Sequence, residues 1–152
     1  MKIEEKIAQR SEELFRQGLY CAESVLLAMA EYHGVKSDLI PRIATGFCSG
    51  MARTSGLCGA VSGGIMGISL QYGRCSPKES VEPSYHAIRT FLTEFERRFG
   101  STNCSQLLGC RLDTPEGQCF FRENNLREKC QMFTREAAKM AAAAIHSQSK
   151  QQ

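Results

Sequence analysis

Glycine recurs at every fourth position, at Gly59, Gly63 and Gly67, within the segment 58–72. Residues four apart lie on one face of an α-helix, and each glycine in a helix interior costs about 1 kcal/mol relative to alanine. Local propensity therefore opposes this helix, and close approach of a neighbouring backbone along the glycine face is what can compensate. We expect a buried, glycine-rich central helix around which the rest of the chain packs.

Hydrophobic spacing predicts helices in most of the remaining chain. The clearest covers residues 81–99, where apolar side chains alternate steps of four and three, with Pro83 in the first turn and Gly100 at the end. The segments 49–57 and 109–117 are expected to be loops, and no segment alternates like a strand. The other predicted helices cover residues 3–17, 21–33, 38–47, 101–108 and 126–141. The predicted fold is all-α, an irregular bundle of five or six helices around the glycine-rich helix.

Length and charge narrow the class of protein. The 152 residues fit one helical domain, expected over residues 1–146, and the polar end 147–152 is expected to be a disordered tail. No apolar run approaches the roughly 20 residues that cross a bilayer, and the N-terminus is charged throughout, so we expect a cytoplasmic protein without membrane insertion. The net charge of +3 is spread out, which argues against nucleic acid as a partner.

The chain is rich in cysteine, but it lacks the close cysteine pairs of familiar sites. Eight of its 152 residues are cysteine, a smaller share than the roughly 8 to 10% of short secreted disulfide scaffolds. In a reducing cytosol so many thiols point to metal binding or redox chemistry. No two are separated by only two residues, so the fold has to assemble any site from distant segments. The cysteines are Cys21, Cys48, Cys58, Cys75, Cys104, Cys110, Cys119 and Cys130.

Three of the cysteines, Cys21, Cys58 and Cys104, stand where predicted helices begin. Unpaired N–H groups and the positive end of the helix dipole favour a thiolate there, and they can lower a cysteine pKa from about 8.5 to roughly 3.5–7.5. Cys130 lies inside the last helix and is expected to point into the bundle. The alternative for any one of them is a buried thiol that acts as a small hydrophobic side chain.

The segment 58–63 reads CGAVSG, and it resembles the CGAxxG signature of the redox-active protein family named for its C_GCAxxG_C_C pattern. The order of the surrounding cysteines and glycines also fits, over about residues 14–144. The resemblance implies a redox role, a family often encoded near transporter genes, and four shared cysteines. Those four are Cys21, Cys58, Cys104 and Cys130.

The remaining cysteines are not carried over by the resemblance. Cys48 stands in a glycine-rich loop where the family pattern would lead us to expect glycine, which leaves open either a fifth thiol near the site or a merely buried one. Roles for Cys75, Cys110 and Cys119 also stay open.

Other kinds of site find no support. His33, His86 and His146 are isolated, and Glu82 and His86 are four residues apart, without the paired Glu-x-x-His motifs that a di-iron bundle needs. No nucleophile elbow, dinucleotide-binding glycine motif or Walker lysine occurs.

The leading hypothesis is one redox centre built from Cys21, Cys58, Cys104 and Cys130. Its chemistry is either disulfide exchange, with Cys58 as the attacking thiolate, or electron transfer by an iron–sulfur cluster held by the four thiolates. The alternative is a non-redox module in which the same four thiolates hold zinc. A third interpretation is a purely structural helical protein. A redox partner is implied but unidentified, and the glycine face can pack within the chain or across a homodimer.

Overall fold

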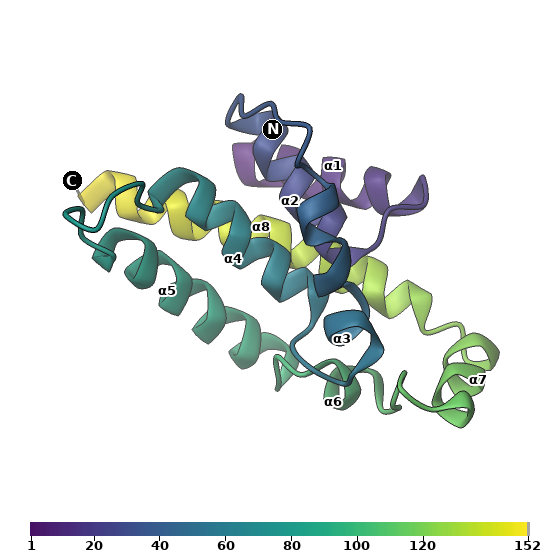
Figure 1. Cartoon of the computed structure of the whole chain (residues 1–152). Helices are drawn as coiled ribbons and strands as arrows, with labels where there is room; N and C mark the ends of the chain where they lie inside the picture. The colour runs from purple at the N-terminus through teal and green to yellow at the C-terminus, as the bar shows by residue number, and fades with distance from the viewer. Residues whose placement is uncertain (152) are drawn as a thin grey trace.

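A computed structural model describes residues 1–151 and is all-α, as predicted (Figure 1). Over these residues one isolated β-bridge joins Leu57 to Asn103, and there are no strands. The helices are α1 (Ile3–Arg16), α2 (Cys21–Tyr32), the 3-10 helix η1 (Arg42–Phe47), α3 (Cys48–Arg53), α4 (Gly59–Tyr72), α5 (Glu82–Phe99), α6 (Cys104–Leu108), α7 (Pro115–Glu123) and α8 (Arg127–Gln151).

The described chain holds eight α-helices rather than the predicted five or six, because two segments expected to be loops are assigned as helix. The segment around Pro115 looked like a turn, but it is the start of α7. The Thr114 side chain caps this helix by accepting a hydrogen bond from the Gly117 N–H at 3.0 Å, and proline suits the first helical turn.

The second such segment is α3, which is not an ordinary helix. Residues 49 to 53 all have positive φ, between 56° and 67°, so the chain makes a left-handed turn here. L-residues adopt this conformation singly rather than in runs, because it brings Cβ close to the following carbonyl oxygen. A run of this kind requires support from the surrounding structure.

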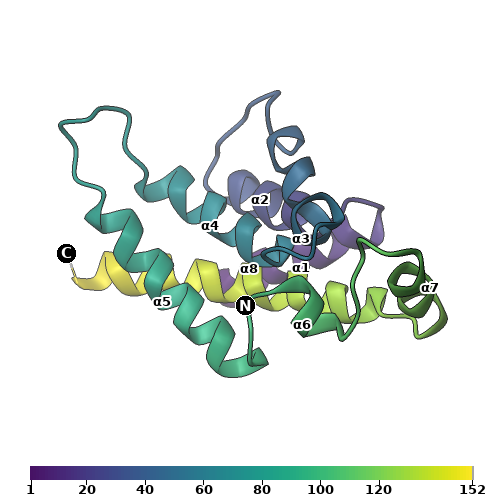
Figure 2. The same cartoon turned by 60° about the horizontal axis from the view of Figure 1, so that its bottom comes forward.

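The glycine-rich segment forms a buried central helix, as predicted. Helix α4 packs against α2, α5 and α8 (Figures 1 and 2). A Cβ at Gly63 would lie 2.8 Å from the Ala22 carbonyl oxygen and 3.0 Å from Val25 Cβ, both in α2. A Cβ at Gly64 would lie 2.5 Å from the Phe91 ring of α5. The missing side chains therefore let two helices approach α4 closely.

Helix α8 is the long support of the bundle and contacts α1, α2, α4 and α5. It continues through residues 147–151, where a disordered tail was predicted, and Gln152 lies outside the described residues. The Gln148 side chain donates a hydrogen bond of 2.7 Å to the Pro83 carbonyl oxygen, and the Tyr72 hydroxyl contacts Ser149. These contacts hold the polar end of α8 on its neighbours, so the predicted tail is wrong for residues 147–151.

The short elements α3, α6 and α7 gather at the end of the bundle away from the C-terminus (Figure 2). None of the helices in residues 1–151 combines the length and the hydrophobicity needed to cross a bilayer.

Candidate functional site

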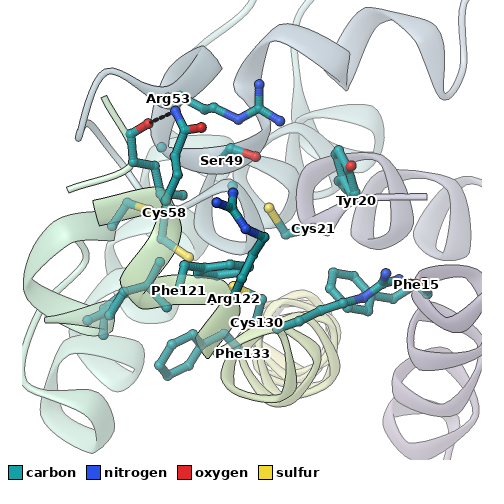
Figure 3. Close-up of a pocket in the computed structure, with 18 residues that line it drawn as sticks. Phe15, Tyr20, Cys21, Ser49, Arg53, Cys58, Phe121, Arg122, Cys130 and Phe133 are labelled. Carbon is teal, nitrogen blue, oxygen red and sulfur yellow. Dashed lines mark hydrogen bonds between the residues drawn. The ribbon is translucent and has the colours of Figure 1, made fainter. Parts of the chain in front are cut away.

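One cavity of about 310 Å³ is lined by four cysteines that are far apart in sequence (Figure 3). They are Cys21, Cys58, Cys104 and Cys130, the four that sequence reasoning singled out. Each comes from a different helix or helix start, on α2, α4, α6 and α8. The fold thus brings the four predicted site cysteines around a common space.

The local structure explains how three of these thiols reach the cavity. Cys21 and Cys104 are the first residues of α2 and α6, and Cys58 is the N-cap of α4, as predicted. The β-bridge fixes two of them to each other, because the Cys58 N–H donates to the Thr102 carbonyl oxygen at 2.8 Å and the Cys104 N–H donates to that of Gly56 at 2.9 Å. Both cysteines flank the bridged pair, so their side chains leave the bridge on the same face.

Two glycines, Gly59 at the start of α4 and Gly50 in α3, leave room for the thiols. A Cβ at Gly59 would collide with Cys21 Sγ and would lie 3.0 Å from the Phe47 carbonyl oxygen. A Cβ at Gly50, where φ is +67°, would lie 2.6 Å from Cys104 Cβ and 3.0 Å from its Sγ. The left-handed turn α3 therefore packs its glycine directly against the Cys104 side chain.

The thiols of Cys58 and Cys104 do not have the lowered pKa that their helix-start positions predicted. Burial raises the pKa of Cys58 to about 11, although the backbone N–H groups of Val61 and Ala60 act in the opposite direction. Burial also raises the pKa of Cys104 to about 11. The prediction is wrong because a buried thiolate loses its hydration, and here that loss outweighs the effect of the helix start.

Cys58, Cys104 and Cys130 lie close enough to influence one another. The pKa of Cys130 is raised to about 12, mainly by burial and also by the neighbouring Cys58 and Cys104, whereas Arg127 acts in the opposite direction. Cys110, just after α6, also raises the pKa of Cys104 and Cys130. These thiols are protonated at neutral pH in the bare cavity, and ionising one of them disfavours ionising the next.

Apart from Tyr20, Ser49 and Gln118, the rest of the cavity wall is apolar or positively charged. Arginines reach it from three elements, Arg53 on α3, Arg122 on α7 and Arg127 on α8, and no aspartate or glutamate among residues 1–151 lines it. The Arg127 guanidinium donates to the Phe15 carbonyl oxygen at 3.0 Å and lies over the Phe15 ring. Arg53 and Arg122 have no ion pair among residues 1–151. The apolar lining comes from Phe15, Leu107, Leu108, Leu112, Phe121 and Phe133.

The family model described as "Putative redox-active protein (C_GCAxxG_C_C)" matches residues 19–144. The chain belongs to this family. An uncharacterized protein of Archaeoglobus fulgidus is 29% identical over 116 residues, which cover 70% of this chain and 77% of that protein. No solved structure matches the chain. The family match covers every cysteine of the cavity, and the family's description gives a redox character without a reaction.

Cys48 is a fifth thiol beside the four of the C_GCAxxG_C_C pattern. It is buried, and the nearby Cys21 thiol together with burial raises its pKa above the usual range. Its sulfur also lies 3.7 Å from a carboxylate oxygen of Glu23. The sequence left the place of Cys48 open, and the structure puts it next to Cys21.

Two cysteines lie elsewhere. Cys75 is exposed on the connection between α4 and α5, and the Cys119 thiol contacts Glu123 of its own helix at 3.4 Å. Neither lines the cavity, so both serve as reference thiols outside the site.

No three histidine, cysteine, aspartate or glutamate side chains within the described part of the chain form a group that could hold a metal ion. A zinc ion needs four sulfurs at about 2.3 Å from one point, and the thiols surround a wider space instead. The donor type fits zinc or a cluster, but the spacing does not assemble a single-ion site.

Proposed function

We propose that Cys21, Cys58, Cys104 and Cys130 form one redox centre that works by thiol–disulfide exchange. The observation that carries this proposal is the common cavity, which is lined by all four thiols. Family membership supports a redox role. Exchange needs thiols that a substrate disulfide can reach, and a cavity of about 310 Å³ lined by all four offers that access.

Cys58 is the attacking thiol in this proposal. The N–H groups of Ala60 and Val61 favour its ionised form, and they would stabilise negative charge on sulfur as the proton leaves to solvent. Its thiolate attacks one sulfur of the substrate disulfide, and the departing sulfur takes up a proton. Cys104 or Cys130 then loses a proton and attacks the mixed disulfide. Two protein thiols are oxidised to one disulfide, and the substrate disulfide is reduced to two thiols.

A second candidate is electron transfer by an iron–sulfur cluster held by the same four thiolates. The specific observation in its favour is the positive wall, since Arg53, Arg122 and Arg127 would offset the negative charge of four thiolates and a cluster. A bound cluster would supply one-electron transfer. The protein's own contribution would be the four sulfurs, the arginine charges and the apolar wall that limits water.

The test is anaerobic purification followed by metal and sulfide analysis, thiol counting and disulfide mapping against oxidised dithiothreitol. Metal-free protein that reversibly forms a disulfide including Cys58 supports exchange. Iron with sulfide supports the second candidate, and one zinc per chain without thiol oxidation supports the non-redox module. Cys58→Ser should abolish the exchange, whereas the matched control Cys75→Ser should leave it unchanged. Exchange that survives Cys58→Ser would overturn the assigned role.

A further inference from the structure

Cys21 and Cys48 are neighbouring cysteines beside the cavity. Both are buried, at 9% and 3% exposure, and a Cβ built on Gly59 would meet both Cys21 Sγ and Cys48 Cα, the latter at 3.1 Å. In keeping with this proximity, Cys21 raises the pKa of Cys48. The pair is therefore assembled from the start of α2 and the junction of η1 with α3.

The other cavity thiols influence one another in a different set. Cys58 and Cys104 raise the pKa of Cys130, and Cys104 raises that of Cys58. The pKa of Cys48 is raised by Cys21 and by Glu23. Cys21 and Cys48 are therefore considered as a pair beside the group of Cys58, Cys104 and Cys130.

Access to the cavity differs between the two members of the pair. Cys21 lines the cavity, whereas Cys48 does not. The Cys48 sulfur lies 3.6 Å from the Ala44 carbonyl oxygen and 3.7 Å from Glu23 Oε1, and Glu23 Oε1 also accepts the Tyr20 N–H at 3.0 Å. The other oxygen of Glu23 accepts a hydrogen bond from the Thr45 hydroxyl at 2.9 Å. Glu23 is thus held in place, with a carboxylate oxygen facing the second thiol.

We propose that Cys21 and Cys48 are a second dithiol–disulfide pair, with Cys21 as the thiol that meets substrate and Cys48 as the one that resolves it. This rests on the proposed function in one respect, that a disulfide substrate enters the cavity. The proposal adds Cys48, which is outside the four cysteines of the family pattern, and it assigns the Glu23 carboxylate to accept the Cys48 proton.

The step balances as follows. The Cys21 thiol loses its proton to solvent and attacks the substrate disulfide, and the first substrate thiolate leaves and is protonated. Cys48 passes its proton to Glu23 and attacks the Cys21 sulfur of the mixed disulfide. The second substrate thiolate then leaves and takes up a proton. Two protein thiols become one disulfide, and one substrate disulfide becomes two thiols.

The experiment is disulfide mapping of the reduced full-length chain after exposure to oxidised glutathione as the probe disulfide. Trypsin places Cys21, Cys48, Cys58 and Cys130 in four different peptides, 17–36, 43–53, 54–74 and 130–135, so each cross-link identifies its partners. We expect the peptides 17–36 and 43–53 to be joined. Cys48 that stays fully alkylatable after denaturation, while other cavity thiols are oxidised, would overturn the proposal.

A variant separates a resolving thiol from a merely buried one. In Cys48→Ala, the fraction of Cys21 that carries glutathione should be at least tenfold higher than in the parent chain, because no thiol resolves the mixed disulfide. Cys119→Ala is the matched control and should leave glutathione at Cys21 unchanged. Equal glutathione at Cys21 in the parent and in Cys48→Ala would contradict the resolving role. Mapping of the parent chain gives a result even if the variant does not fold.

Failure of this inference is distinguishable from failure of the proposed function. Oxidation that joins Cys58 to Cys104 or Cys130 but spares Cys48 leaves the proposed function intact and refutes the second pair. A chain in which no cavity thiol is oxidised refutes both. A disulfide between Cys21 and Cys48 that still forms in Cys58→Ser supports a pair that acts independently.

Discussion

Replacement of Gly63 by alanine tests the idea that α2 and α4 are held at backbone contact distance. The new Cβ would meet the Ala22 carbonyl oxygen at 2.8 Å, Ala22 Cα at 3.0 Å and Val25 Cβ at 3.0 Å. Two of these atoms belong to the backbone and cannot rotate away, so the helices have to move apart. The matched variant is Gly67→Ala, whose Cβ meets the flexible thioether side chain of Met29 instead.

The expected magnitudes follow from two opposing effects. Overpacking costs about 1–3 kcal/mol, and the gain in helix propensity from glycine to alanine is about 1 kcal/mol. With rigid neighbours the cost falls at the upper end of its range, so Gly63→Ala should lower the free energy of unfolding by about 2 kcal/mol. Gly67→Ala should change it by less than about 1 kcal/mol because Met29 can adjust.

The assay is urea unfolding of both variants and the parent, followed by circular dichroism and read as the change in free energy. Because α2 carries Cys21 and Cys58 caps α4, Gly63→Ala should also slow disulfide formation in the cavity. A Gly63→Ala protein as stable as Gly67→Ala would refute the claim that this face of α4 contacts the α2 backbone.

Three further predictions concern the cavity. The rate of alkylation of Cys58 should rise about tenfold per pH unit from pH 7 to 10, because the pKa of this thiol is raised to about 11. An alkylation rate that stops rising near pH 8 would indicate a thiol with an ordinary pKa. Because burial raises the pKa of Cys58 and Cys104 to about 11, folding favours the protonated thiols. The protonated thiols contribute fully to the free energy of unfolding below about pH 9. Towards pH 11 that contribution falls by up to about 3 kcal/mol per thiol, because one pKa unit corresponds to 1.36 kcal/mol. A free energy of unfolding in urea that does not fall between about pH 9 and pH 11 would contradict the burial argument. Gly50→Ala should lower the free energy of unfolding in urea by about 2 kcal/mol or more, because the new Cβ would lie 2.6 Å from Cys104 Cβ and the residue has a φ of +67°. An unchanged unfolding midpoint would contradict the close contact between α3 and Cys104.

Sequence periodicity was sufficient to predict a helix where burial and local helix propensity agree. It was also sufficient where a poor helix propensity could be explained only by close packing. The repeat of Gly59, Gly63 and Gly67 predicted a buried helix, because only close packing compensates for its poor propensity. Cys21 and Cys104 lie at helix starts, as predicted, and Asn103 caps α6 by accepting a hydrogen bond from the Gln106 N–H.

The start of α7 was missed although its signal is local, because Thr114 caps the helix and Pro115 suits its first turn. The sequence was insufficient where long-range contacts decide, and the polar end of α8 stays helical because Gln148 reaches Pro83. The sign of the pKa shift at Cys58 depends on burial by distant segments, which the spacing of residues does not reveal. For the same reason, the sequence did not indicate that Arg53 and Arg122 would reach the cavity.

The central claim, that distant thiols meet at one cavity, is tested most directly by bridging neighbouring thiols in the native protein with dibromobimane, followed by peptide mapping. We expect bridges that join Cys58 to Cys104 or Cys130, and none that involve Cys75, which lies outside the cavity. Recovery of Cys58 modified singly or not at all, with no bridge to either partner, would contradict the arrangement on which the proposed redox centre depends.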